Sequence, residues 1–192
     1  MNTYTTILFL HIVSFAIGLG AASMLALCLF NLRAAQTLAD AVPWGAAAGK
    51  VEKGFPVAIV GLYATGIYMT SDVWTWDSGW IVVSIVGLAV VSLQGPLVGG
   101  RAAHKLKSAL MENGPGQLGP VPRGLARHPA LWIPEFANIG IVLGIVWNMT
   151  QKPGTGEAIA AVVIGYAAGV LFATRFTGAP AEVSTGAAES SA

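Results

Sequence analysis

Five apolar segments alternate with shorter polar stretches along the 192-residue chain. A helix needs about 20 apolar residues to cross the hydrocarbon core of a bilayer. Four segments are close to or beyond that length, and amphipathic flanks can extend the remaining one, the second. We therefore predict an all-α fold, a polytopic transmembrane helix bundle with five spans. The segments are Ile7 to Leu32, Phe55 to Thr70, Trp80 to Val98, about Ile133 to Met149 and about Ala158 to Phe176.

Basic residues are distributed unevenly between these segments. With five spans, nine of the ten Lys and Arg residues fall on one side of the membrane, and Lys152 alone falls on the other. The positive-inside rule assigns the basic side to the cytoplasm. We therefore expect the N-terminus outside and the C-terminus in the cytoplasm. The nine are Arg33, Lys50, Lys53, Arg101, Lys105, Lys107, Arg123, Arg127 and Arg175.

The composition supports a membrane protein and excludes some functions. Hydrophobic residues make up 55% of the chain and charged residues 10%, whereas a soluble domain carries about 25% charged residues. A net charge of +1 with few clustered charges argues against nucleic acid as a partner. The single cysteine, Cys28, allows neither an intrachain disulfide nor a cysteine-based metal motif.

The remaining segments suggest one domain and a tail. Residues 1–176 form the predicted transmembrane helix-bundle domain, and residues 177–192 are small and polar, typical of a disordered cytoplasmic tail. The Ala-rich stretch from Arg33 to Gly54 is expected to be helical beyond the membrane. The Gly- and Pro-rich stretch from Asn113 to Pro122 is expected to be an irregular loop.

Small residues spaced four apart predict close helix contacts. In lipid, such pairs let two backbones approach and gain dispersion energy. The pairs are Gly140 with Gly144, Gly165 with Gly169, and Ala16 with Gly20.

His11 is the foremost candidate for chemistry, because a polar group inside a span is costly. It could be an axial ligand to haem, a ligand to another metal or a proton carrier. The simpler interpretation, which we favour, is a histidine hydrogen-bonded to a neighbouring helix or to lipid headgroups. His104 and His128 fall on the opposite face, so two histidines of one chain cannot ligate the same haem.

A haem at His11 would therefore need a different arrangement. Met69 and Met149 are the candidate second ligands, since both fall near outer helix ends. The alternatives are a five-coordinate iron or a site shared with a partner.

Glu135 and Asn138 form a second polar group inside a span, one turn apart on the same helix face. Glu135 could build a proton or ion site together with Arg101 or His104. A structural explanation is favoured here: Pro134 suits a first helical turn, and the adjacent carboxylate suits the positive end of the helix dipole.

Two further intramembrane polar residues have mainly structural interpretations. Gln94 precedes Gly95 and Pro96, where the proline should kink the helix, and its amide could also line a cavity. Lys152 ends the fourth segment and can extend to lipid headgroups. The chain shows no nucleophile–base pair, phosphate loop or paired-carboxylate motif, so we do not expect an enzyme.

Short motifs carry a resemblance to known families. They include Leu10-His11 in the first span, Thr65-Gly66-Ile67-Tyr68 ending the second, Gly79-Trp80 opening the third, and Lys152-Pro153 after the fourth. With these, the chain resembles a family of small bacterial integral membrane proteins of uncharacterised function. It is more distantly similar to membrane helix bundles of the copper-resistance and haem-biosynthesis type. That similarity implies His11 as a haem ligand.

These observations lead to three hypotheses for a multi-pass protein of the bacterial inner (plasma) membrane. The first is a non-catalytic accessory or structural subunit, surrounded by lipid and associated with other membrane subunits or with copies of itself. The second is a redox protein that binds haem b through His11 and Met149. The third is a small transporter or channel with a cavity near Gln94 and Glu135; Asn138 and Lys152 are the other polar residues expected in the spans.

Overall fold

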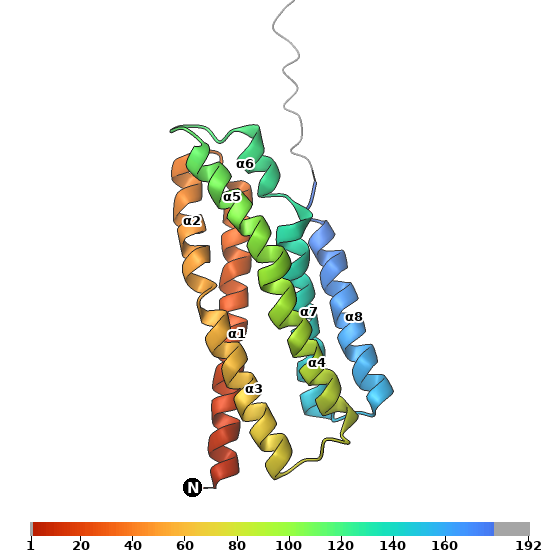
Figure 1. Cartoon of the computed structure of the whole chain (residues 1–192). Coiled ribbons are helices and arrows are strands. Elements are labelled where there is room, and N and C mark those ends of the chain that lie inside the picture. Colours follow the sequence, from red (N-terminus) through yellow and green to blue (C-terminus); the bar gives the residue numbers. More distant parts are fainter. Residues whose placement is uncertain (1, 179–192) are drawn as a thin grey trace, which may run out of the picture.

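The computed structural model describes residues 2–178, and the elements found there are helices. Their order follows the predicted apolar segments, with additional helices in between (Figure 1). The elements are α1 (Thr3–Ala34), α2 (Leu38–Val51), α3 (Gly54–Asp72), α4 (Gly79–Gln94), the π-helix η1 (Gly95–Gly100), α5 (Arg101–Glu112), α6 (Pro120–Leu125), α7 (Pro129–Gln151) and α8 (Thr155–Thr174).

Five helical segments are long and apolar enough to span a membrane, which confirms the predicted all-α bundle and its multi-pass character. The side of the membrane on which each terminus lies stays a prediction. The predicted disordered tail lies outside the described residues from position 179 onward. The five segments are Thr3–Ala34, Leu38–Asp72, Gly79–Glu112, Pro120–Gln151 and Thr155–Thr174.

The spans form two groups (Figure 1). In one, α1 packs along α3; in the other, α7 packs extensively against α8 and also against α4. The groups are linked by sparser contacts between α3 and α4 and between α1 and α7. They come together at the end of the bundle that carries α2, α5 and α6, which we call the basic end because of its Lys and Arg residues.

Small residues hold α1 against α3, but they are not the predicted pair. Gly61 leaves room for the Ser14 hydroxyl, and a Cβ added at Gly18 would lie 3.2 Å from the Ala58 Cβ. Ala16 and Gly20 are exposed, and Gly20 has nothing within 4 Å of an added Cβ. The prediction that Ala16 and Gly20 mediate packing within the chain is therefore wrong. At 3.6 residues per turn they lie on a different face of α1 from Ser14 and Gly18.

Glycines also join α7 to α8, as the sequence predicted. A Cβ at Gly140 would collide with the backbone carbonyl of Gly165, and one at Gly169 would collide with that of Phe136. At Gly144 the added Cβ would lie 2.7 Å from the Ala161 carbonyl oxygen. The two backbones therefore touch directly, and the predicted role of these glycines is confirmed.

The basic end contains a compact apolar core. Helix α5 is amphipathic and buries Ala102, Leu106 and Leu110 at a four-residue spacing, which places them on one helix face. They pack with Leu32 of α1 and with the fully buried Trp132 of α7. Helix α2 covers the same core, so the expectation of a helix between Arg33 and Gly54 is confirmed.

The Gly- and Pro-rich stretch is a loop only as far as Gly119. The backbone N–H of Leu38 donates to the Gly116 carbonyl at 2.9 Å, and the N–H of Leu118 donates to the Gln36 carbonyl at 2.9 Å. From Pro120 the chain is helical, as α6, so the loop prediction was wrong for Pro120–Pro122. Proline suits a first helical turn because its missing N–H would have no partner there.

Candidate functional site

His11 lies half-buried between α1 and α3. Its Nδ1 is 2.8 Å from the Thr65 Oγ1, and the Thr65 hydroxyl donates to the Gly61 carbonyl at 2.6 Å. The ring also lies beside Gly66, where an added Cβ would be in ordinary van der Waals contact, 3.5 Å from the His11 Cε1. The expected hydrogen bond between His11 and a neighbouring helix is therefore present.

These two hydrogen bonds are compatible with a neutral ring that carries its proton on Nδ1. The Thr65 hydroxyl has one hydrogen, and its shortest contact is to the Gly61 carbonyl. When that hydrogen is donated to Gly61, Thr65 Oγ1 accepts a hydrogen bond from the His11 Nδ1–H. The Nε2 of a neutral imidazole in this tautomer carries the lone pair. A histidine oriented through its other nitrogen is the arrangement that metal-binding histidines use.

The two candidate methionines differ in their relation to His11. Met69 lies on α3, one turn beyond Thr65, and is buried. Met149 lies on α7, in the other helix group, with 37% of its surface exposed. The contacts of the His11 ring described above are to Thr65 and Gly66, neither of which is an iron ligand. The structure therefore places Met69 in the same helix group as His11, and Met149 in the other group.

Gln94 ends α4, where the helix changes type. Pro96 lacks the N–H that would bond the Ser92 carbonyl in an α-helix. The chain forms the π-helix η1 from Gly95 to Gly100 and continues into α5. The sequence predicted a proline kink here, and the structure has a wider helical turn. Such π segments are frequent at functional sites.

Glu135 is buried, with 9% of its surface exposed, and its Oε1 has no hydrogen-bond partner among the described residues. Neither Arg101 nor His104 pairs with that oxygen. The favoured structural explanation was wrong, because α7 begins at Pro129 and Pro134 lies inside the helix. Glu135 is thus beyond the first turn, where the helix dipole acts most strongly.

Asn138 lies one turn after Glu135 and, like it, has a buried side-chain oxygen, here Oδ1, without a hydrogen-bond partner among the described residues. Its Nδ2 would be 3.8 Å from a Cβ added at Gly95, so the amide faces the start of η1. The structure therefore brings the predicted pair together with the π-helix that follows Gln94.

Lys152 has a defined role at the opposite end. It adopts a left-handed conformation (φ 50°, ψ 50°) that ends α7, and its backbone N–H donates to the Asn148 carbonyl. Its Nζ lies 4.9 Å from the centroid of the Trp74 ring. A cation at that distance from an indole face is attracted to it. This contact fixes the segment between α3 and α4 against the end of α7.

An aromatic cluster lies at the basic end and was not predicted from the sequence. Phe30, Phe136 and Phe176 surround Trp132, with ring centroids 5.0 to 6.2 Å from the indole. The Trp132 Nε1–H donates to the Ala126 carbonyl at 2.9 Å. Trp132 and Phe136 lie one turn apart on α7, but Phe30 comes from α1 and Phe176 follows α8, so spacing along the chain gives no sign that these two join the cluster.

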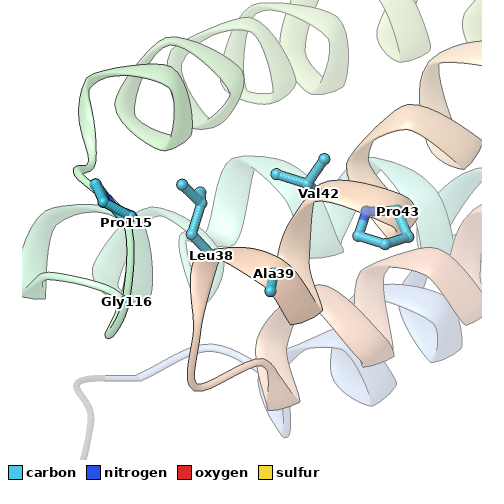
Figure 2. A pocket seen from close by; sticks show the side chains of 6 residues that line it. All are labelled: Leu38, Ala39, Val42, Pro43, Pro115 and Gly116. Carbon is cyan, nitrogen blue, oxygen red and sulfur yellow. The ribbon is translucent and has the colours of Figure 1, made fainter.

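One pocket lies at the basic end, between the start of α2 and the loop before α6 (Figure 2). It is lined by Leu38, Ala39, Val42, Pro43, Pro115 and Gly116. None of these side chains is polar.

Comparison with known proteins found no matching family model, no similar curated protein and no similar solved structure.

Proposed function

We propose that the chain is a non-catalytic subunit of a complex in the bacterial inner membrane, with its basic end in the cytoplasm. The observation that carries this proposal is the face of α1 turned away from α3. That face is exposed and includes Ala16, Gly20 and Ser23 among larger apolar residues.

Small residues serve little purpose against lipid, because acyl chains adapt to any side chain. Against a second helix they permit close backbone approach, which drives association in membranes. Ala16 and Gly20 have the four-residue spacing that places both on one helix face. This surface therefore suits a transmembrane helix of a partner subunit.

Affinity purification of the tagged chain in a mild detergent tests the proposal. We expect a partner subunit at constant stoichiometry and its loss in Gly20→Ile, because the larger side chain prevents close approach. Ala64→Ile is the matched control, at an exposed small residue of α3. A chain that purifies alone from its native membrane, or equal retention of the partner by both variants, would refute the subunit role.

A haem-binding redox function is the second candidate, and the free Nε2 of His11 favours it. A haem bound there would supply one-electron chemistry at its iron. The chain's own contribution is to hold the imidazole: the hydrogen bond between Nδ1 and Thr65 orients the ring. Met149 would have to act from the other helix group.

The visible spectrum of the purified protein tests this candidate. Haem bound through His11 would give a Soret band that His11→Ala abolishes and Thr65→Val weakens, since valine cannot orient the ring. Met149→Leu separates a methionine-ligated iron, whose spectrum would change, from a five-coordinate one. Absence of the band in protein from haem-supplied cells would exclude this function.

A further inference from the structure

A second polar site lies in the other helix group, on the face of α7 that carries Glu135 and Asn138. The two residues are three positions apart and therefore adjacent on the helix surface. Each has a buried side-chain oxygen without a hydrogen-bond partner among the described residues. Buried polar atoms are nearly always paired, so two unpaired acceptors on adjacent turns require an explanation.

The π-helix η1 packs against this part of α7. A Cβ added at Gly99 would be 3.8 Å from the Pro134 Cβ, and one added at Gly95 would be 3.8 Å from the Asn138 Nδ2. These positions of η1 therefore face α7 immediately before Glu135 and at Asn138, at distances where an added Cβ would make ordinary van der Waals contact. Irregular helices next to intramembrane carboxyl groups are a recurrent way to present oxygen ligands to Na⁺ or H⁺.

Charges near the site do not neutralise Glu135. The charged group that acts on it electrostatically is another carboxylate, Glu52, which is exposed between α2 and α3. On α1, the Arg33 guanidinium lies over the rings of Trp132 and Phe176.

The other elements packed against α7 bring few charges. Helix α4 and η1 contain no charged residue or histidine. Arg175, after α8, lies over Phe172. Helix α5 begins with Arg101 and carries His104, and neither pairs with the buried Oε1. The site thus has two acceptor oxygens and a second carboxylate nearby, and no Lys, Arg or His side chain among residues 2–178 pairs with Oε1.

We propose that Glu135 and Asn138, beside the π-helix η1, form a buried binding site for a single small cation, either Na⁺ or H⁺. The Glu135 carboxylate supplies the negative charge, and the Asn138 amide oxygen is a neutral ligand. Glu52 lies on the exposed side and attracts cations toward the site. Both candidates carry one positive charge and bind to oxygen: Na⁺ would be coordinated by the oxygen atoms of both residues, and H⁺ would be bonded to the Glu135 carboxylate. The site is separate from the α1 surface and from His11. An experiment that refutes the proposed function would therefore leave the cation site untouched, and the reverse also holds.

Labelling with dicyclohexylcarbodiimide tests this site in the full-length chain, purified in a mild detergent. The reagent is apolar and adds to protonated carboxyl groups in apolar surroundings, and mass spectrometry of the peptides locates the adduct. We expect an adduct on Glu135 that decreases when Na⁺ is added or when the pH is raised. Protection by NaCl relative to choline chloride at constant pH identifies Na⁺, and protection only by raising the pH identifies H⁺.

Variants establish the role of each residue. Glu135→Gln should lose the adduct completely, whereas Glu112→Gln, at an exposed glutamate, should leave it unchanged. If the cation is Na⁺, Asn138→Leu should raise the NaCl concentration needed for half-protection by about fivefold. If it is H⁺, the proton concentration at half-labelling should change by the same factor. Fivefold is about the effect of losing one hydrogen-bonding group. Asn31→Leu is the matched amide control on α1.

The decisive measurements use the unaltered chain, so a variant that fails to fold does not affect them. Glu135 that stays unlabelled across the pH range, or that is labelled equally under all conditions, would overturn the proposal. An Asn138→Leu variant that keeps its helical content and responds like the Asn31→Leu control would also overturn it.

Discussion

Replacing Gly140 with alanine tests whether the contact between α7 and α8 stabilises the bundle. The new Cβ would overlap the Gly165 carbonyl, whose carbon atom would be only 2.6 Å away. Ordinary van der Waals contact begins near 3.4 Å. The obstacle is backbone and not a flexible side chain, and the carbonyl oxygen lies nearer still, so the helices themselves must move apart by at least about 0.8 Å. A gap of about that size forfeits a quarter to a half of each dispersion contact.

The expected loss follows from two opposing contributions. Overpacking in a rigid interface costs about 1–3 kcal/mol, and a backbone obstacle falls at the upper end of that range. Alanine regains about 0.5–1 kcal/mol because glycine loses more conformational entropy in a helix. The net destabilisation is therefore about 2 kcal/mol, which corresponds to a factor of about 30 in the ratio of folded to unfolded protein.

Equilibrium unfolding in mixed micelles, with SDS added to a mild detergent and tryptophan fluorescence as the signal, measures this difference. Gly20→Ala is the matched control, since an added Cβ there has nothing within 4 Å. We expect the control to be slightly more stable than the wild type in the isolated chain. A Gly140→Ala variant that is as stable as Gly20→Ala would show that the close contact between α7 and α8 does not stabilise the bundle.

Three further substitutions test other parts of the structure. Trp132→Ala should destabilise the bundle by about 3–5 kcal/mol in the same unfolding experiment, because it empties a fully buried site, and an unchanged midpoint would show that the aromatic cluster is not formed. Thr65→Val should change the ¹⁵N NMR shifts of the His11 ring, since it removes the acceptor that fixes the Nδ1–H tautomer, and identical spectra would contradict that assignment. Lys152→Met should cost about 0.5–1 kcal/mol, and the loss should be absent in a Trp74→Leu background if the cation–π contact is its cause.

Sequence patterns predicted the spans well because a membrane imposes a simple rule. Every backbone polar group must be paired in lipid, so long apolar segments become helices. The spacing of Gly140 and of Gly165 also predicted close helix contacts, because glycines on one helix face let the backbone of a neighbouring helix approach. The prediction was wrong for Ala16 and Gly20. Their spacing shows that one face of the helix carries small residues, but it does not show which helix packs against that face.

The candidate sites were predicted only in part. His11 was singled out because a polar group in a span is costly, but its partner, Thr65, is 54 residues away, and no local pattern connects them. The error at Glu135 arose from the start of α7, which is four residues earlier than the apolar segment suggests. Helix ends depend on caps such as His128, whose Nδ1 accepts from the Ala130 N–H at 3.1 Å. Hydrophobicity carries no information about such caps.

The core at the basic end has a consequence for biosynthesis. The contact between α7 and α8 joins neighbouring segments, so this helical hairpin can form as soon as both have left the ribosome. The core around Trp132 also needs Leu29 from the first helix and Ala173 from the last. It therefore closes only after nearly the whole chain has been made. Until then Trp132 lacks part of its packing, and a chain truncated before Ala173 would leave this core open to chaperones and proteases.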